Sequence, residues 1–238
     1  MKSKITIDLE KLMKNKPRLV LGLVALVLVL SLSFFFGGSE TTLLDTIPEW
    51  DGVTAYVEIN DNIPFFTDEE IVMESYESYG ELDGLGRCTV AIACVGTDIM
   101  PSDDRGSISS VDPTGWQSVQ YDFVSGKYLY NRCHLIGFQL TGENANKQNL
   151  ITGTRFLNIN GMLPFEDMIA DYVKETGNHV MFRVTPIFEG DNLVASGVLM
   201  EAISVEDDGE GICFCVYAYN NQPGVVIDYA TGDSHPAE

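Results

Sequence analysis

Basic residues are scarce in most of this chain. Of its 238 residues, 14 are Lys or Arg and 35 are Asp or Glu, giving a formal charge of −21 at pH 7. Residues 37–238 hold eight of the basic residues against 33 acidic ones. Taken alone, this imbalance argues against a nucleic-acid binder that relies on a basic surface. Six of those eight basic residues fall within 122–183, where six acidic residues balance them, so this stretch repels a polyanion least.

Internal repeats, low-complexity tracts and paired cysteine motifs are also missing beyond residue 36. The 45% hydrophobic content is typical of a folded chain and excludes a disordered or collagen-like one. The five cysteines include no CxxC pair and no zinc-ligand spacing, and an odd number leaves at least one thiol unpaired. Cys133 adjoins His134, but neighbouring residues of a strand point apart, which favours a structural cysteine over a nucleophile. Cys213 and Cys215 are expected to share one strand face and to pack there.

A basic segment and an uncharged segment make up the first 36 residues. Residues 1–18 carry six basic and two acidic residues, and residues 19–36 carry no charge. As a helix, this uncharged run would reach about 27 Å, enough to cross a hydrocarbon core. We expect a cytoplasmic tail at 1–18, a single transmembrane anchor at 19–36, a tether at 37–48 and an extracellular domain at 49–234, held at the cell membrane. Signal cleavage, giving a secreted protein, is the alternative.

Beyond the anchor, the pattern predicts strands around one principal helix, an α+β fold. That helix is expected over 155–175, interrupted near Gly161, broken at Pro164 and ended by Gly177. Because of the expected break, Asn158 and Glu166 are not assigned to one helix face. A further helix is expected over 67–79, and a hairpin turn at 125–126 between strands 119–124 and 127–130. Strands are also expected at 53–59, 88–95, 150–154, 179–188, 193–204, 212–219 and 225–229.

Histidine is rare, and one of the three histidines stands beside many amides. His235 lies in a polar tail that we expect to be disordered, and His179 begins an apolar strand, which is typical of a structural histidine. His134 precedes the amide-rich segment Thr141–Asn158 by a few residues. These amides either cap a loop or supply an oxygen to a hard cation such as Mg²⁺, with histidine as general base toward water. The residues alone leave both interpretations open.

Three segments around these residues resemble a known enzyme family. They are NRCHLIG at 131–137, ENANKQNLITGTRFLN at 143–158 and GMLPFEDMIADYV at 161–173. They resemble the DNA/RNA non-specific endonucleases of the ββα-metal (His-Me finger) type, particularly the streptodornase-like branch, over residues 47–234. The resemblance implies a ββα-metal nuclease core on a central, mostly antiparallel sheet. It also implies divalent-metal-dependent, sequence-non-specific hydrolysis of phosphodiester bonds in DNA, and in RNA, with 5′-phosphate products.

The resemblance assigns a role to each matching residue. It makes His134 the general base, Asn158 the Mg²⁺ ligand (with Mn²⁺ as a substitute), Asn149 a support of the site and Glu166 an acid near the metal. Arg132 joins this catalytic set as a candidate clamp on a phosphate oxygen, as does Arg155; structural pairing with an acid is the alternative for each. Arg155 and Lys147 are the candidates for substrate contacts.

Two positions depart from the family's Asp-Arg-Gly-His pattern, namely Asn131 and Cys133, which bear on how His134 is oriented. A catalytically inactive surface module that binds DNA on the same fold is therefore the alternative to an enzyme. A tethered binder for DNA uptake and a toxin-like nuclease with an immunity partner are further alternatives. No obligate protein partner is expected.

Overall fold

The computed structural model of the chain describes residues 46–238, in which Ile47–Glu238 form one compact unit. The expected cytoplasmic tail, the transmembrane anchor at 19–36 and most of the tether lie outside the described residues. Within residues 46–238, no helix is both long and apolar enough to span a membrane.

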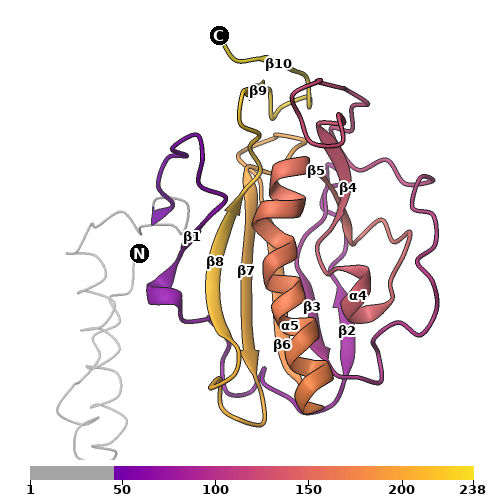
Figure 1. Ribbon diagram of the computed structural model, residues 1–238, viewed down its shortest axis with the longest axis vertical. Coiled ribbons are helices and arrows are strands. Elements are labelled where there is room, and N and C mark those ends of the chain that lie inside the picture. The colour runs from indigo at the N-terminus through magenta and orange to yellow at the C-terminus, as the bar shows by residue number, and fades with distance from the viewer. Residues whose placement is uncertain (1–45) are drawn as a thin grey trace, which may run out of the picture. The chain divides into compact units, whose positions relative to one another are not determined.

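A six-stranded antiparallel sheet forms the centre of this unit (Figure 1). Its strands, in spatial order, are β1 (Tyr56–Glu58), β8 (Cys213–Tyr219), β7 (Gly197–Ser204), β6 (Val180–Ile187), β3 (Ala91–Val95) and β2 (Tyr76–Tyr79). All three longest strands, β6 to β8, alternate apolar side chains toward a covered face. In β6, for example, Phe182 and Val184 are fully buried in the main core, whereas Arg183 faces the opposite side.

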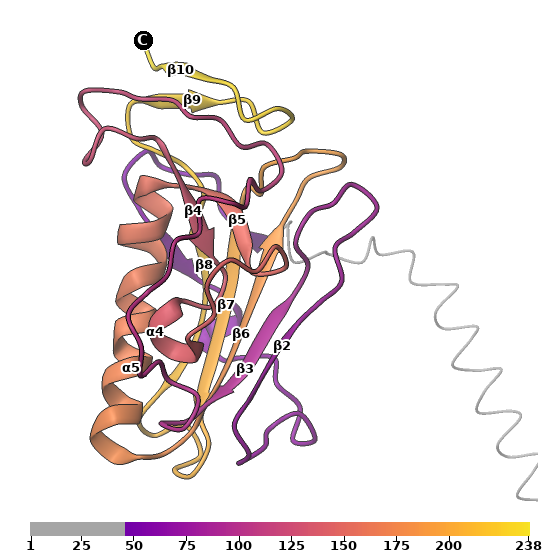
Figure 2. The same ribbon diagram turned by 90° about the vertical axis from the view of Figure 1, so that its right-hand side faces the viewer.

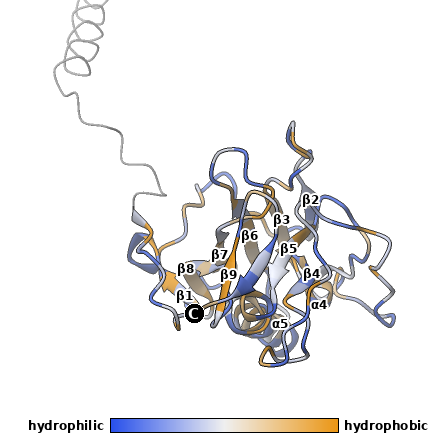
Figure 3. Ribbon diagram, turned by 90° about the horizontal axis from the view of Figure 1, so that it is seen from above, coloured by the Kyte–Doolittle hydropathy of each residue, from blue (hydrophilic) through white to orange (hydrophobic). Residues whose placement is uncertain are grey.

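A helical layer covers one face of the sheet, as Figures 2 and 3 show from two directions. Its elements are the short helix α4 (Phe138–Thr141), the π-helical turn η2 (Leu157–Met162), helix α5 (Leu163–Thr176) and the hairpin of β4 (Tyr130–His134) and β5 (Leu150–Thr154). The main core lies between these elements and the sheet. As expected, α5 ends at Gly177, whose φ of 74° suits a residue without Cβ and whose N–H donates to the Val173 carbonyl.

The other face of the sheet is covered by the irregular segment that precedes β2. Arg183 reaches from β6 to Glu201 and to Glu70, at 2.9 Å in each case, and its guanidinium lies 4.4 Å from the centre of the Phe66 ring. Glu201 is 2% exposed, so this ion pair is internal to the fold. The pairing holds residues 66–70 against the sheet and gives a structural role to Arg183, one of the six basic residues of the neutral stretch.

The prediction of a helix over residues 67–79 is wrong. The capping contact forms, because the Thr67 N–H donates to Glu70 Oε2 at 2.9 Å, but it closes a single turn. A continued helix would place Glu70, Glu74 and Glu77 on one side, where like charges three and four residues apart repel. Residues 76–79 instead pair with β3 as the edge strand β2, which satisfies their backbone groups.

Strands β9 (Val225–Ile227) and β10 (Ser234–Pro236) form a small separate sheet, at the top of Figure 1. The expectation that His235 is disordered is wrong, because it pairs with Val226 across this sheet. A 3-10 turn, η1 (Asn60–Asn62), follows β1. The expected hairpin at 119–130 keeps its turn, with the Lys127 N–H bonded to the Val124 carbonyl at 2.8 Å, but its ladder reduces to the bridge between Gln120 and Tyr128.

Candidate active site

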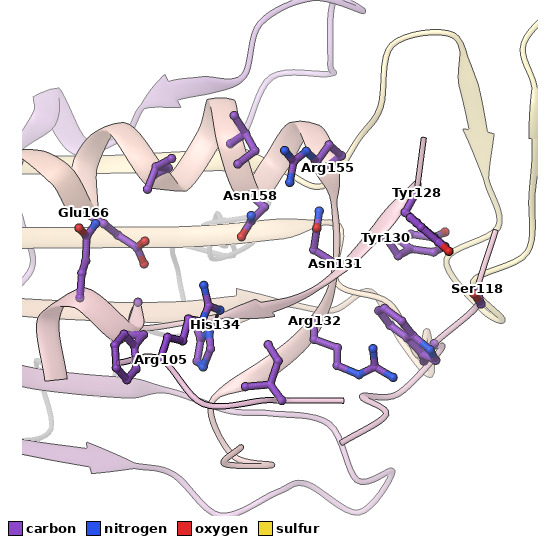
Figure 4. A pocket seen from close by; sticks show the side chains of 17 residues that line it. Arg105, Ser118, Tyr128, Tyr130, Asn131, Arg132, His134, Arg155, Asn158 and Glu166 are labelled. Atoms are coloured by element: carbon purple, nitrogen blue, oxygen red, sulfur yellow. Dashed lines mark hydrogen bonds between the residues drawn. The ribbon is translucent and has the colours of Figure 1, made fainter. Parts of the chain in front are cut away.

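A β-hairpin followed by a helix builds the site. In the β4–β5 hairpin, His134 stands opposite Leu150 at the end of the ladder, where the side chain emerges beside the first turns of the following helix. That helix starts as η2 and continues as α5, and it carries Asn158 and Glu166. His134, Asn158 and Glu166 line one cavity of about 790 Å³ (Figure 4).

His134 is held in one tautomer. Its Nε2 lies 2.9 Å from the Asn144 carbonyl oxygen and its Nδ1 lies 3.1 Å from Nη2 of Arg105. Because a carbonyl only accepts and a guanidinium only donates, Nε2 carries the hydrogen and Nδ1 the lone pair. Burial lowers the pKa of His134, the Asn144 carbonyl opposes this in part, and the Arg105 charge lowers the pKa further. The imidazole is therefore neutral at pH 7, as a base must be.

Asn158 is oriented by a thiol. The Cys133 Sγ lies 3.1 Å from Asn158 Oδ1 and 3.4 Å from the Met162 sulfur. Burial raises the pKa of Cys133, so the group is a neutral thiol that donates its hydrogen to the amide oxygen. Asn158 Oδ1 keeps a second lone pair for a ligand. Cys133 itself is 1% exposed and structural, as expected, although its contact with the candidate metal ligand was not foreseen.

Glu166 is a buried carboxyl on the first turn of α5. It is 8% exposed, and its Oε1 has no hydrogen-bond partner among the described residues. Burial raises the pKa of Glu166 to about 7, although the backbone N–H of Gly137 hydrogen-bonds the carboxyl group and partly opposes this. A Cβ at position 137 would lie 2.6 Å from Glu166 Oε2, so this approach requires glycine.

A π-helical turn brings Asn158 and Glu166 to the same side of the helix. Eight residues of a regular α-helix would leave them about 80° apart. Because a π turn takes up about one extra residue, the offset falls to about 20°. The expected break at Pro164 is wrong, since the π turn η2 ends at Met162 and α5 begins directly at Leu163, so the helix runs through this proline.

Asn149 supports the site from behind and is completely buried. Its Oδ1 accepts the Ile136 N–H at 2.9 Å and its Nδ2 donates to the Ile136 carbonyl at 3.0 Å. The backbone carbonyl of Asn149 also accepts the Leu135 N–H at 2.9 Å. These bonds fix the chain where it leaves β4, directly after His134.

The arginines and the lysine expected at the site differ in how they are placed. Arg132 lines the cavity, but it donates to the Val111 carbonyl and to Asp112 Oδ1, and its guanidinium lies 4.2 Å from the centre of the Trp116 ring. Arg155 also lines the cavity, and its buried Nε has no hydrogen-bond partner among the described residues. Lys147 is exposed and is not among the residues that line this cavity.

Sequence reasoning missed Arg105. This arginine lies in the irregular segment between β3 and β4, 29 residues before His134, and it reaches the histidine only through the tertiary fold. Its one sequence signal is rarity, because only Arg87 and Arg105 of the basic residues beyond 36 fall outside the neutral stretch. Arg87 pairs with Asp83 at 2.7 Å, which leaves Arg105 as the cation to explain.

The donor set of the cavity suits a hard divalent cation. An amide oxygen oriented by a thiol and a carboxyl oxygen without a partner both line the cavity. Among residues 46–238, no group of three or more His, Cys, Asp or Glu side chains is arranged to hold a metal ion. Mg²⁺ needs only one or two protein oxygens because it keeps most of its waters, so Asn158 with Glu166 behind those waters fits this ion.

The hairpin, the helix and the central antiparallel sheet define a nuclease fold. The family model for DNA/RNA non-specific endonucleases matches residues 67–206, more than half of the chain. The chain belongs to this family and is an endonuclease, which confirms the resemblance seen in the sequence.

Solved structures of nucleases share the fold. NucA from Streptococcus agalactiae with magnesium ion bound is 23% identical, with a TM-score of 0.70 over 83% of this chain and 94% of NucA. Sda1 nuclease with bound zinc ion is 24% identical, with a TM-score of 0.63 over 77% of this chain and 97% of Sda1. An extracellular endonuclease is 21% identical, with a TM-score of 0.55 over 76% of this chain and 96% of that one. A comparison with curated proteins gives no significant match.

Proposed function

We propose that this endonuclease hydrolyses phosphodiester bonds of DNA, and of RNA, with His134 as general base and with Mg²⁺ held by Asn158. The observation that carries the proposal is the arrangement of His134, whose Nε2 is fixed on the Asn144 carbonyl while Nδ1 keeps its lone pair. Asn158 and Glu166 line the same cavity. Magnesium binding by NucA and the oxygen donors of the cavity support Mg²⁺, for which Mn²⁺ can substitute.

In this mechanism His134 Nδ1 removes a proton from the attacking water. The water oxygen forms a bond to phosphorus and the bond from phosphorus to O3′ breaks. The leaving O3′ takes a proton from a solvent water, so the products are a 5′-phosphate and a 3′-hydroxyl. Arg105 must first leave Nδ1, and its guanidinium is then free to contact a phosphate oxygen together with Arg155. When bound, Mg²⁺ supplies positive charge to the phosphate in the transition state. Glu166, whose Oε1 has no partner among the described residues, would accept hydrogen bonds from the waters of a bound ion.

Surface display belongs to the same proposal. The uncharged run at 19–36 behind a basic segment supports a membrane anchor with the nuclease domain outside the cell. Two similar nucleases are described as extracellular, which supports an extracellular domain whether the segment stays or is cleaved. Protease added to intact cells should remove the nuclease domain if it is displayed and should leave it intact if it faces the cytoplasm.

The hydrolysis is tested with the full chain on supercoiled plasmid. Nicking should require Mg²⁺ or Mn²⁺, stop with EDTA, and fall by about 100-fold or more in His134→Ala, the range for loss of a general base. His179→Ala is the matched control, because His179 pairs with Glu206 at 2.6 Å away from the cavity. Intact plasmid with every divalent ion would favour the inactive DNA-binding module instead.

A further inference from the structure

The cavity has a reactive end and an aromatic end. His134 and Asn158 lie toward one end, while Tyr128 and Tyr130 lie toward the other (Figure 4). Trp116 lines the same cavity. A nucleotide chain that places one phosphate beside His134 therefore extends toward a group of aromatic rings.

Tyr128 is the ring best placed to meet a base. It is 50% exposed, although its neighbours Leu129 and Tyr130 are buried in a cluster with Val225. The Tyr130 hydroxyl donates to the Gly232 carbonyl at 3.0 Å, which anchors this end of β4. Tyr128 thus projects into solvent from a rigid base, and a ring that is fixed in this way loses little freedom when it stacks on a ligand.

The cations available for phosphate are few. Three arginines line the cavity, and Arg132 is already bound to Asp112 and to the Val111 carbonyl. Arg105 and Arg155 are left as candidates for contact with phosphate. Residues 46–238 contain eight basic and 31 acidic residues. Non-specific affinity for a duplex depends mainly on neutralising phosphates of both strands. This surface is poorly suited to that kind of binding.

We propose that the enzyme acts on single-stranded nucleic acid, with an unpaired base stacked on Tyr128 while the scissile phosphate lies at His134. The inference rests on the proposed hydrolysis in the same cavity. Stacking on an aromatic ring supplies affinity that needs no cation, and every base has a face for it. In a duplex, those faces are covered by the neighbouring base pairs, so a duplex gains nothing from Tyr128.

The test compares one sequence as a labelled single strand and as a duplex, with the full chain and Mg²⁺. We expect kcat/KM to be about tenfold higher for the single strand, the size of one base stacked on one ring. Tyr128→Ala should bring the ratio of the two values close to one, mainly by raising KM for the single strand. Tyr128→Phe should keep the ratio because it keeps the ring. Phe123→Ala is the matched control, since Phe123 is 58% exposed on the same turn but does not line the cavity.

Binding in EDTA separates this inference from the hydrolysis. Fluorescence anisotropy should give an affinity about tenfold higher for the single strand than for the duplex, and Tyr128→Ala should remove the difference. Equal affinities, or equal kcat/KM values, for the two substrates would overturn the inference. So would a preference that survives in Tyr128→Ala. A binding preference without any cleavage would contradict the hydrolysis while supporting the choice of substrate.

Discussion

Unpartnered polar atoms gather in the active-site cavity. Asn131 Nδ2, Arg155 Nε and Glu166 Oε1 are buried without a hydrogen-bond partner among residues 46–238, and all three residues line the cavity. Each such atom costs roughly 1–3 kcal/mol of stability, which is uncommon in a well-packed fold. Water, substrate or a cation in the cavity can satisfy them.

Glu166 should make the fold less stable as the pH rises. Below about pH 4.5 the carboxyl is protonated in both the folded and the unfolded chain, whereas between 4.5 and about 7 it is protonated only when folded. Unfolding then releases a proton, so the free energy of unfolding falls with rising pH, by on the order of 3 kcal/mol in total. Denaturation of the wild type and of Glu166→Gln at pH 5, 6 and 8 without divalent ions measures this difference. Parallel pH profiles would contradict it.

Cys133 should tune the affinity for the metal. Cys133→Ala removes the hydrogen bond to Asn158 Oδ1, so the amide is free to turn, and we expect Mn²⁺ to bind about tenfold more weakly. Cys133→Ser keeps a donor and should retain most of the affinity. Isothermal titration of the full chain with Mn²⁺ gives both values. Equal affinities in Cys133→Ala and in the wild type would show that the thiol only fills space.

At the scale of elements, the π turn sets the geometry of the site. It lets η2 and α5 present Asn158 and Glu166 to the same cavity, and Gly161 within it allows a close approach to β8, because a Cβ there would lie 3.2 Å from the Ala218 Cβ. π turns of this kind are rare and occur often at functional sites. The π turn thus places the proposed metal ligand, Asn158, on the same side of the helix as Glu166.

Inserting one alanine after the exposed residue Asn160 should destroy the candidate site and keep the fold. The π turn already takes up one extra residue, so a second one rotates Asn158 by about 100° relative to Glu166. We expect cleavage to fall by about 100-fold or more while the circular dichroism spectrum is retained. Deleting Asn160 leaves seven regular helical residues and an offset of about 20°, so this variant should keep Asn158 and Glu166 on one side and remain active. Full activity in the insertion variant would contradict this role of the turn.

The sequence predicts the elements that local pattern determines. The apolar runs of β3, β6, β7 and β8 and the glycine after α5 were enough to place these elements. The ordered residues from His134 to Glu166 indicated the candidate site, and the structure brings His134, Asn158 and Glu166 to one cavity. Residues 67–79 mislead because a capping box describes only the first turn, while pairing with β3 is a long-range contact. The partnership of Arg105 with His134 and the shared face of Asn158 and Glu166 depend on tertiary structure, which local spacing does not contain.

At the scale of the whole molecule, the distribution of charge disfavours tight binding of nucleic acid. The described residues are strongly acidic. Of the arginines that line the cavity, Arg105 hydrogen-bonds His134 and Arg155 Nε has no partner among these residues. Weak, local contact with phosphate favours rapid release of substrate and product. An acidic surface around a cavity that is lined by three arginines and one glutamate thus suits repeated cleavage of a chain that is bound only locally.

Salt should weaken the reaction only slightly. Two arginines in contact with phosphate give a slope of about −1.4 for log kcat/KM against log salt concentration on a single strand. Arg155→Ala should reduce this slope by about half. Cleavage of a labelled oligonucleotide between 50 and 300 mM salt measures it, with roughly constant Mg²⁺. A slope steeper than about −3 would indicate an extended phosphate contact that these residues do not provide.

Chemical rescue of His134 tests the central claim most directly. His134→Gly leaves a space where the buried ring stood, and imidazole added to the solution can enter it and accept the proton. We predict that His134→Gly loses about 100-fold or more in single-turnover cleavage and regains part of it with imidazole, in proportion to the neutral imidazole present. Rescue that is absent at every imidazole concentration while Mn²⁺ binding stays intact, or undiminished cleavage without imidazole, would contradict a general base at His134.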